Sequence, residues 1–275
     1  MQYISTIIMG IVEGLTEFLP VSSTGHLILV ENLINFQADK NHFFEVFIQL
    51  GAILAVVCLY LHRFVGFLNL KKQPEPSFYG LNGIIKISIA CLPVFILGAL
   101  FQNRIKELLF APVTVAAALL VGAVLMIIAE KFQLAQSRRQ TKAFAKVDKL
   151  EALTNQQALL IGIFQCLALW PGMSRSASTI IGAMFCGVSR AVAAEFSFLI
   201  AVPVMCAAVG YDCLKSWDNL EISLLPIFIL GFVVSFISAL VAIKLMLAIL
   251  NKWTLLPFAY YRIILGIIVL GILYV

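Results

Sequence analysis

Six long apolar stretches separate the polar parts of the chain, and each is long enough to cross a bilayer. They cover residues 44–62, 82–101, 112–130, 188–210, 222–250 and 257–275. A helix rises about 1.5 Å per residue and the hydrocarbon core is about 30 Å thick, so each stretch can span it. The pattern predicts six transmembrane helices.

Two further apolar stretches are shorter, and each ends at a proline, Pro20 or Pro171. A polar segment follows each proline, and a second short apolar stretch follows the polar segment. A break between two short helices is tolerated inside a membrane only where protein or water surrounds it, which is the pattern of a re-entrant pair. We therefore expect two re-entrant helix pairs, at 4–19 with 24–35 and at 156–170 with 176–186.

The composition agrees with a membrane protein. The 275 residues are 62% hydrophobic and 12% charged, and the mean hydropathy is +1.03. Soluble domains are nearer half apolar and a quarter charged. We expect one all-α integral-membrane domain, 1–275, and no nucleic-acid partner, because the basic residues carry no aromatic base-stacking pattern. No basic region precedes the first apolar stretch, so we expect that stretch to remain in the mature protein.

The basic residues predict the orientation of the helices. The longest polar loop, 132–152, is rich in Lys and Arg, and positively charged loops stay in the cytoplasm. Counting spans outward from this loop places most of the 19 Lys and Arg residues, Arg262 among them, on the cytoplasmic side. Both termini then lie outside. Arg175 is the one basic residue that this topology places at membrane depth and away from an interface.

The chain also contains an internal repeat. The stretch "GIVEGLTEFLPVSSTGH" from Gly10 resembles "GIFQCLALWPGMSRSAS" from Gly162, and Glu13 aligns with Gln165. One deleted residue then aligns Pro20 with Pro171 and Ser23 with Ser174. Each half, 1–131 and 153–275, holds one re-entrant pair and three spans, and an odd number of spans inverts the second half. Inverted repeats with broken helices place their site near the midplane, where the halves meet.

Glu13 and Glu17 are four residues apart and share one face of the first short helix. Two carboxylates resist burial together unless a cation or protons compensate them. Their oxygens suit Mg²⁺ or Ca²⁺, particularly when substrate phosphates supply other ligands. The alternative is an interfacial pair that faces water. Glu45, Gln49 and Glu195 begin later spans, and we expect solvation at the interface for each.

Hydroxyl groups follow the first proline. Ser22, Ser23 and Thr24 precede a short helix at N-cap positions. They serve as caps, and the helix end they form also suits an anion such as phosphate. His26 lies about one turn further on, where it can act as a base or a proton shuttle.

The second polar segment, "PGMSRSAST", contains Arg175 among Ser174, Ser176, Ser178 and Thr179. The planar guanidinium suits phosphate oxygens. The alternative is that Arg175 pairs with Glu13 or Glu17 and holds the two halves together. Acids, a metal, an arginine and hydroxyls around an anion indicate phosphoryl transfer, and a site inside a membrane suits a lipid phosphate.

Two other functions fit part of this pattern. Inverted repeats with re-entrant pairs are also a transporter architecture, so a transporter or flippase of a lipid phosphate is the alternative. A metal-free phosphatase that works through a phosphohistidine needs a second histidine after the "SRS" segment. The only histidines are His26, His42 and His62, so that second histidine is missing.

Four stretches of the sequence resemble the undecaprenyl-diphosphate phosphatase family, also called the bacitracin resistance protein family. They are "GIVEGLTEFLPVSSTGHLIL", "FFEVFIQLGAILAVV", "FQCLALWPGMSRSASTI" and "GVSRAVAAEFSFLIAVP". The resemblance implies a hydrolase that converts undecaprenyl diphosphate to undecaprenyl phosphate with a divalent cation. It implies the bacterial inner membrane, a site open to the periplasm, and a role in recycling the lipid carrier of peptidoglycan synthesis.

The resemblance also implies roles for single residues. Glu13 and Glu17 hold the metal or activate the attacking group, and Arg175 clamps the diphosphate. Ser23 is the candidate nucleophile with His26 as its partner; Ser22, His26 itself and a metal-bound water remain open as nucleophiles. The phosphate-binding set adds Ser22, Thr24, Ser174, Ser176 and Thr179. The oligomeric state stays open, a homodimer included.

Overall fold

The computed structural model describes residues 2–34, 36, 43–69, 77–109, 111–139, 147–216 and 222–273. These residues form helices joined by short turns, with no strand among them beyond one isolated bridge between Val147 and Val188. The α-helices are α1 (Gln2–Thr16), α2 (Ser23–Ile34), α3 (Phe43–Leu59), α4 (Leu61–Phe67), α5 (Gly80–Leu109), α6 (Pro112–Arg139), α7 (Asn155–Gln165), α8 (Arg175–Phe185), α9 (Arg190–Ser216), α10 (Leu225–Lys252) and α11 (Leu256–Leu273). Three short 3-10 helices, η1 (Leu150–Ala152), η2 (Cys166–Leu169) and η4 (Ile222–Leu224), complete them.

The prediction of an all-α, multi-pass membrane protein is confirmed. Four helices in the described part of the chain, α5, α6, α9 and α10, are long and apolar enough to cross a membrane. Helices α3 and α4 together are apolar enough for a fifth span but bend by 76°. Helix α11 is apolar and shorter. Length and composition thus support four or five of the six predicted spans.

The predicted cytoplasmic loop, 132–152, is partly helical. Helix α6 continues through the end of its apolar stretch to Arg139, so residues 132–139 extend the helix. Gln, Lys and Arg propagate a helix readily once it is nucleated, which explains the extension. Residues 140–146, with Lys142 and Lys146, lie outside the described residues, as do Lys40, His42, Lys71 and Lys72.

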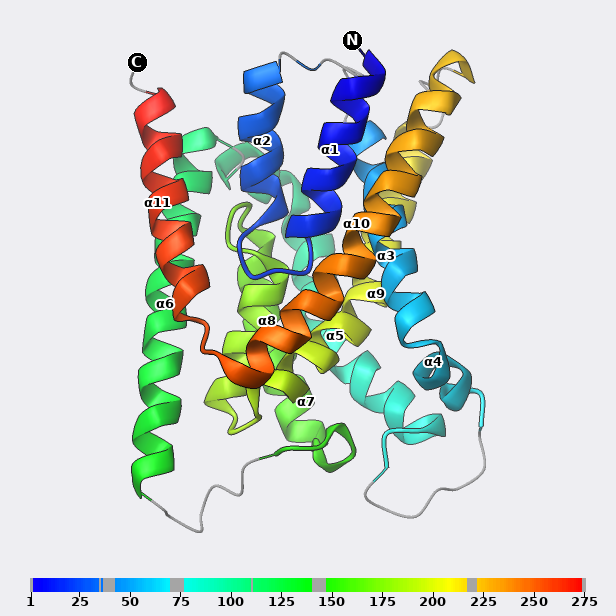
Figure 1. Cartoon of the computed structure of the whole chain (residues 1–275). Coiled ribbons are helices and arrows are strands. Elements are labelled where there is room, and N and C mark those ends of the chain that lie inside the picture. The colour runs from blue at the N-terminus through cyan, green and yellow to red at the C-terminus, as the bar shows by residue number, and fades with distance from the viewer. Residues whose placement is uncertain are drawn as a thin grey trace.

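Two helical hairpins enter the molecule from opposite ends (Figure 1). The α1–α2 hairpin enters from the end where both termini lie, and α7, η2 and α8 form a hairpin from the other end, where α6 finishes and η1 begins. Their turns meet in the interior, where Ser176 Oγ donates a hydrogen bond to the carbonyl of Leu19 (2.9 Å). The fold therefore brings together two polar segments that are about half the chain apart.

Helix α10 packs along both α1 and α3, and glycine allows the close approach. A Cβ atom on Gly51 of α3 would lie 2.3 Å from the carbonyl oxygen of Phe232 on α10. Helices in membranes associate by close van der Waals packing, which small residues permit. Because α3 and α1 carry polar residues of the interior site, this packing also sets the position of that site.

We expect Gly51→Ala to lower the thermal unfolding temperature of the detergent-solubilised protein by several degrees. Overpacking of a tight interface costs about 1–3 kcal/mol, because α10 has to move away. Gly210→Ala is the matched control, since a Cβ on Gly210 meets no atom within 4 Å. Equal unfolding temperatures for the two variants would contradict this account of the α3–α10 contact.

Charged residues near the end opposite the termini form ion pairs. Arg63 of α4 pairs with Glu151 (2.7 Å) and with Glu195 of α9 (3.1 Å), and Arg190 pairs with the buried Glu130. Glu195, which was predicted to be solvated, therefore has a cationic partner. Burial raises the pKa of Glu151, but the hydrogen bond and charge of Arg63, together with a backbone hydrogen bond and the charge of Lys149, lower it by more. The stability from this pair is therefore present at neutral pH and is lost as the pH falls through that lowered pKa.

Candidate active site

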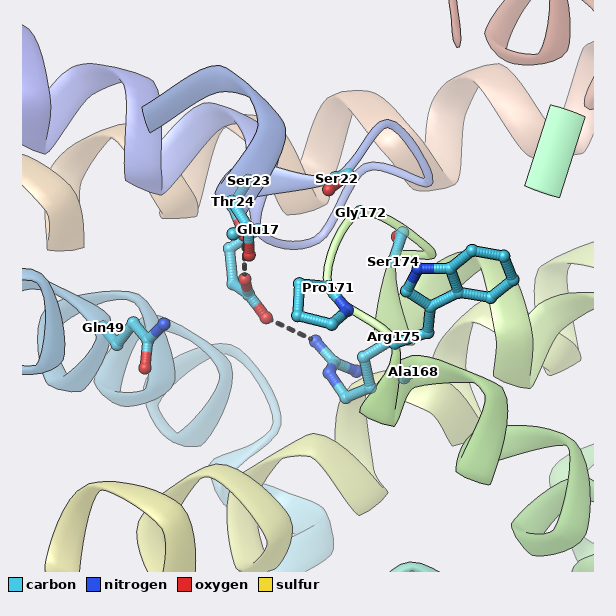
Figure 2. Close-up of a pocket in the computed structure, with 11 residues that line it drawn as sticks. Glu17, Ser22, Ser23, Thr24, Gln49, Ala168, Pro171, Gly172, Ser174 and Arg175 are labelled. Atoms are coloured by element: carbon cyan, nitrogen blue, oxygen red, sulfur yellow. Dashed lines mark hydrogen bonds and ion pairs between the residues drawn. The ribbon is translucent and has the colours of Figure 1, made fainter. Parts of the chain in front are cut away.

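A polar pocket of about 120 Å³ lies where the two hairpin turns meet. Figure 2 shows its lining side chains, which come from the α1–α2 turn, from α3, and from the turn between η2 and α8. The lining residues are Glu17, Ser22, Ser23, Thr24, Gln49, Ala168, Trp170, Pro171, Gly172, Ser174 and Arg175. Of the ten predicted site residues, the pocket thus contains both serines and the threonine of the first turn, one acid, the arginine and Ser174.

A serine begins the helix on each side of the pocket in the same unusual conformation. Ser22 has a φ of 73° and Ser174 has a φ of 71°, which is the left-handed region that non-glycine residues rarely adopt. The Ser22 hydroxyl accepts a hydrogen bond from the N–H of Gly25 (3.3 Å), and the Ser174 hydroxyl accepts one from the N–H of Ala177 (3.2 Å). Ser22 is therefore an N-cap, as predicted, whereas Ser23 and Thr24 lie inside the first turn of α2. A left-handed φ costs a non-glycine residue about 1–3 kcal/mol, so both serines hold a strained backbone.

These caps change the residue pairing between the two hairpin turns. The sequence comparison paired Ser23 with Ser174 after a deletion, whereas cap and φ pair Ser22 with Ser174. The structural pairing needs no deletion, because Gly10 with Gly162 and Glu13 with Gln165 share the same offset. The sequence alignment was wrong because it matched Pro20 with Pro171. A proline ends a helix equally well at either of two neighbouring positions, so it does not fix the register of the alignment.

Glu17 joins the two turns at the pocket. Its Oε2 accepts a hydrogen bond from Ser23 Oγ (2.7 Å), and its Oε1 lies 3.1 Å from Nη2 of Arg175 (Figure 2). Both side chains of this ion pair are only 9% exposed. The three groups therefore form one connected unit in which a carboxylate links a hydroxyl to a guanidinium.

Other residues fix the position of the Arg175 side chain. Its Nη1 donates to the carbonyl of Ser197 (3.0 Å) and to the Ser197 hydroxyl (3.3 Å), and its guanidinium lies 5.5 Å from the ring of Phe18. Its Nε is buried and has no hydrogen-bond partner in the described part of the chain. The guanidinium is thus fixed by Ser197 and Phe18, and its Nε–H donor is unused among the described residues. Such a group is suited to bind a further acceptor such as a phosphate oxygen.

Glu13 lies behind the pocket and is fully buried. Among the residues that the structure describes, neither of its carboxylate oxygens has a hydrogen-bond partner, and its electrostatic neighbours are Glu17, Glu45 and Arg175. An uncompensated buried carboxylate is costly, so this one needs a cation or a proton. The orphaned oxygens fit the predicted divalent cation. In the part of the chain that the structure describes, no group of three or more His, Cys, Asp or Glu could hold a metal, so other oxygen ligands would have to complete such a site.

His26 does not line the pocket. Its Nδ1 lies 2.7 Å from the carbonyl of Ser22 and its Nε2 lies 2.7 Å from the hydroxyl of Tyr261, whose ring stacks on it. A carbonyl only accepts, so Nδ1 carries the proton, and a neutral ring then accepts from Tyr261 through Nε2. The structure pairs Ser23 with Glu17, where the sequence had suggested His26.

Two predicted phosphate ligands instead hold the start of α8. The Ser176 hydroxyl bonds to the Leu19 carbonyl and to Ser174 Oγ (3.0 Å). Thr179 Oγ1 donates to Ser197 Oγ (2.7 Å), which is also the group that contacts Arg175. These residues place the turn and the arginine, and neither lines the pocket.

The sequence analysis missed Gln49, whose amide points toward the pocket in Figure 2. It had been expected to be solvated at the interface together with Glu45. The spacing of Glu45 and Gln49 could have indicated this role, because polar residues four apart on an otherwise apolar helix share one face. The structure places that face of α3 against the site.

Arg262 is also a correction. The predicted topology put it at the cytoplasmic interface, but it is fully buried beside the two turns and bonds to main-chain carbonyls from both. Arg262 is thus buried more deeply than Arg175, which is 9% exposed. A span boundary drawn from hydropathy cannot locate an arginine whose partners are backbone groups, because every residue has a carbonyl.

The sequence matches one family model along most of its length. Residues 6–268 match the model described as bacitracin resistance protein BacA. A protein of Nitratidesulfovibrio vulgaris named undecaprenyl-diphosphatase is 51% identical over 260 residues, 94% of each chain. Proteins of the same name from Maridesulfovibrio salexigens (51% identical, 96% of each chain) and Desulfovibrio desulfuricans (48% identical, 96% of this chain and 95% of the other) are similar. With its paired turns, its buried acids and this match, the chain belongs to the bacitracin resistance protein BacA family.

Proposed function

We propose that this protein hydrolyses undecaprenyl diphosphate to undecaprenyl phosphate and inorganic phosphate, which recycles the lipid carrier of peptidoglycan synthesis and confers bacitracin resistance. The observation that carries the proposal is the unit of Ser23, Glu17 and Arg175 between two helix N-termini. It combines a nucleophile, a proton acceptor and a phosphate clamp in one pocket. Relatives named for this reaction support a phosphatase over the flippase alternative.

The pocket suggests how its residues divide the work. A diphosphate that enters competes with Glu17 for Arg175 and uses the free Nε donor. Glu17 is then released to accept the Ser23 proton, while the N–H groups at the starts of α2 and α8 and Arg175 face the phosphate charge.

In the proposed reaction, Ser23 Oγ forms a bond to the terminal phosphorus. The bond from that phosphorus to the bridging oxygen breaks, and undecaprenyl phosphate leaves with the electron pair. Water then attacks the phosphorus of the phosphoserine, the bond from phosphorus to Ser23 Oγ breaks, and Ser23 Oγ takes the proton back from Glu17 as inorganic phosphate leaves. This order of events separates the lipid product from the phosphate, as in other covalent routes.

Glu13 and Glu17 would hold a divalent cation, Mg²⁺ or Ca²⁺, which neutralises phosphate charge when bound. The support is the pair of unpartnered oxygens on Glu13 and the hard oxygen chemistry of both carboxylates. Gln49 adds a neutral amide oxygen to the same wall of the pocket.

The purified wild-type protein should release phosphate from undecaprenyl diphosphate in detergent with Mg²⁺ or Ca²⁺ present. Absence of phosphate release under these conditions, from protein that unfolds cooperatively on heating, would refute the proposed function. Ser23→Ala separates attack by Ser23 from direct attack by water. It should remove turnover if Ser23 attacks, and it should leave substantial turnover if water attacks directly.

We expect EDTA to stop phosphate release and added Mg²⁺ or Ca²⁺ to restore it. Glu13→Gln should release little phosphate even with the cation present, and it should also lose the rise in unfolding temperature that Ca²⁺ gives the wild type. In EDTA the same variant should unfold at a higher temperature than the wild type, because it removes an uncompensated buried charge. A Ca²⁺-induced rise that persists in Glu13→Gln would contradict the assignment of Glu13 to the cation.

We also propose six spans and two re-entrant pairs in an inverted repeat, 1–131 and 153–275, joined by the basic loop 132–152. The opposed hairpins and the matching caps at Ser22 and Ser174 support it. The proposed location is the bacterial inner membrane, with the site open to the periplasm. Alkaline phosphatase fused after α11 should then be active, and an inactive, stably expressed fusion would refute this orientation.

A further inference from the structure

The proposed reaction does not use Arg262 of α11, although this side chain adjoins both turns of the pocket. It is fully buried and does not line the pocket. Its three nitrogens donate five hydrogen bonds, each to a main-chain carbonyl. Nε donates to Leu119 (3.2 Å), Nη1 to Pro20 (3.3 Å) and Met173 (2.9 Å), and Nη2 to Ala118 (3.1 Å) and Gly172 (3.0 Å).

These five carbonyls belong to three separate parts of the chain. Pro20 is in the α1–α2 turn, Gly172 and Met173 are in the turn before α8, and the other two residues are on α6. One planar guanidinium therefore spans both turns and ties them to one transmembrane helix. A lysine could not do this, because an ammonium has three donors and no fixed plane.

The anchored carbonyls lie next to the groups that face the pocket. Pro20 is two residues from Ser22, and Met173 directly precedes Ser174, the two serines with left-handed φ angles. Backbone strain persists only where the surroundings hold it. Arg262 restrains both strained turns, because it donates hydrogen bonds to each turn within two residues of its serine.

A glycine leaves the space for this guanidinium. A Cβ on Gly122 of α6 would lie 2.1 Å from Nη2 of Arg262 and 2.8 Å from its Cζ. Gly122→Ala therefore displaces the guanidinium without changing its chemistry. The same contact can thus be disturbed from either side.

We infer that Arg262 is a positioning residue that sets the separation of the two turns, so that Ser23 from one and Arg175 from the other meet the same diphosphate. The role of Arg262 in turnover rests on the proposed function. Its structural role, which is to hold the second turn in place, can be tested without turnover.

The test compares wild type with Arg262→Lys, Gly122→Ala and the double variant. The control is Arg190→Lys, which alters the pairing of another arginine with Glu130, a group that does not line the pocket. Turnover is measured as kcat and KM for phosphate release, and folding is measured as the unfolding temperature. Trp170 lines the pocket, so its fluorescence, with Trp217 and Trp253 replaced by Phe, reports the second turn without turnover.

We expect kcat to fall about 100-fold in Arg262→Lys and in Gly122→Ala, while KM changes less than threefold, because misplacement of about 1 Å costs about that factor. The double variant should be no slower than the slower single variant, since both changes disturb one contact. Arg190→Lys should lower the unfolding temperature and leave kcat unchanged. Trp170 fluorescence should shift in the Arg262 and Gly122 variants only.

The inference is overturned if Arg262→Lys keeps wild-type kcat and Trp170 fluorescence, or if the two single effects multiply in the double variant. Should Arg262→Lys fail to fold, Gly122→Ala carries the test with the same expected results. Should the wild type release no phosphate, the proposed function fails. The fluorescence of Trp170 then still tests the structural role. A shift in Arg262→Lys means that Arg262 holds the turn, and an unchanged spectrum means that it does not.

Discussion

Arg175→Ala is expected to lower kcat for phosphate release by at least about 1000-fold. Arg175 is the cation of the pocket unit, and it adds a buried Nε donor that no described residue uses. Arginines that stabilise the charge of a transferring phosphoryl group are worth about 10³–10⁵ in turnover. Alanine removes every one of these donors and also frees Glu17 from its ion pair.

The loss of the ion pair predicts a second, separable effect. Glu17 and Arg175 are both 9% exposed, and a buried carboxylate left without its partner destabilises a fold. Arg175→Lys keeps the positive charge but loses the planar, forked guanidinium. It should therefore unfold near the wild-type temperature, while kcat still falls more than tenfold. The measurement is kcat at saturating substrate together with the unfolding temperature.

Arg190→Ala is the matched control for Arg175→Ala, because it also removes an arginine from a buried glutamate, Glu130. It should lower the unfolding temperature and leave the kcat of the folded protein within about twofold. Arg175→Ala with kcat near that of Arg190→Ala would mean that Arg175 only joins the two turns, which was the structural alternative for this residue.

Glu17→Gln is expected to lower kcat by about 100-fold or more with little change in shape. Glutamine can still accept a hydrogen bond from Ser23 through its amide oxygen, but its NH₂ group then faces the Arg175 guanidinium, donor against donor. It cannot take the Ser23 proton. Loss of a positioned proton acceptor typically costs about 10²–10⁴ in rate.

Glu130→Gln is the control for Glu17→Gln, because it neutralises another buried glutamate that is paired with an arginine. Glu130 also accepts a hydrogen bond from the N–H of Leu255 (2.7 Å), so this variant should lose stability and keep its kcat. Wild-type kcat in Glu17→Gln, measured with the cation present, would remove Glu17 from the chemistry.

Much of the site could be predicted because charge is rare in this chain. Glu13, Glu17 and Arg175 stand in apolar surroundings where each charged group is costly, so their presence already marks a site. Periodicity placed the two acids on one helix face, and the proline breaks located the turns. The alternative in which Arg175 pairs with Glu17 is what the structure shows in the pocket, and that pairing remains compatible with a phosphate clamp.

The rest of the site could not be predicted, because it depends on which helices become neighbours in the fold. Gln49 and Ser197 are ordinary polar residues on long apolar helices, and only packing brings them to the pocket and to Arg175. His26 lay near Ser23 in sequence, but its ring turns toward Tyr261, a residue from the far end of the chain. Hydroxyl and amide groups accept many partners, so sequence spacing cannot select one.

The sequence by itself determined the class of fold, the two polar turns and the charged residues of the site. It could do so because the apolar solvent makes length, hydropathy and charge placement decisive. Only the tertiary structure decided that Ser23 pairs with Glu17, that Glu13 lies behind the pocket, and that Arg262 grips both turns. Those contacts run between segments far apart in the chain or to backbone carbonyls, and such carbonyls leave no mark in an amino-acid sequence.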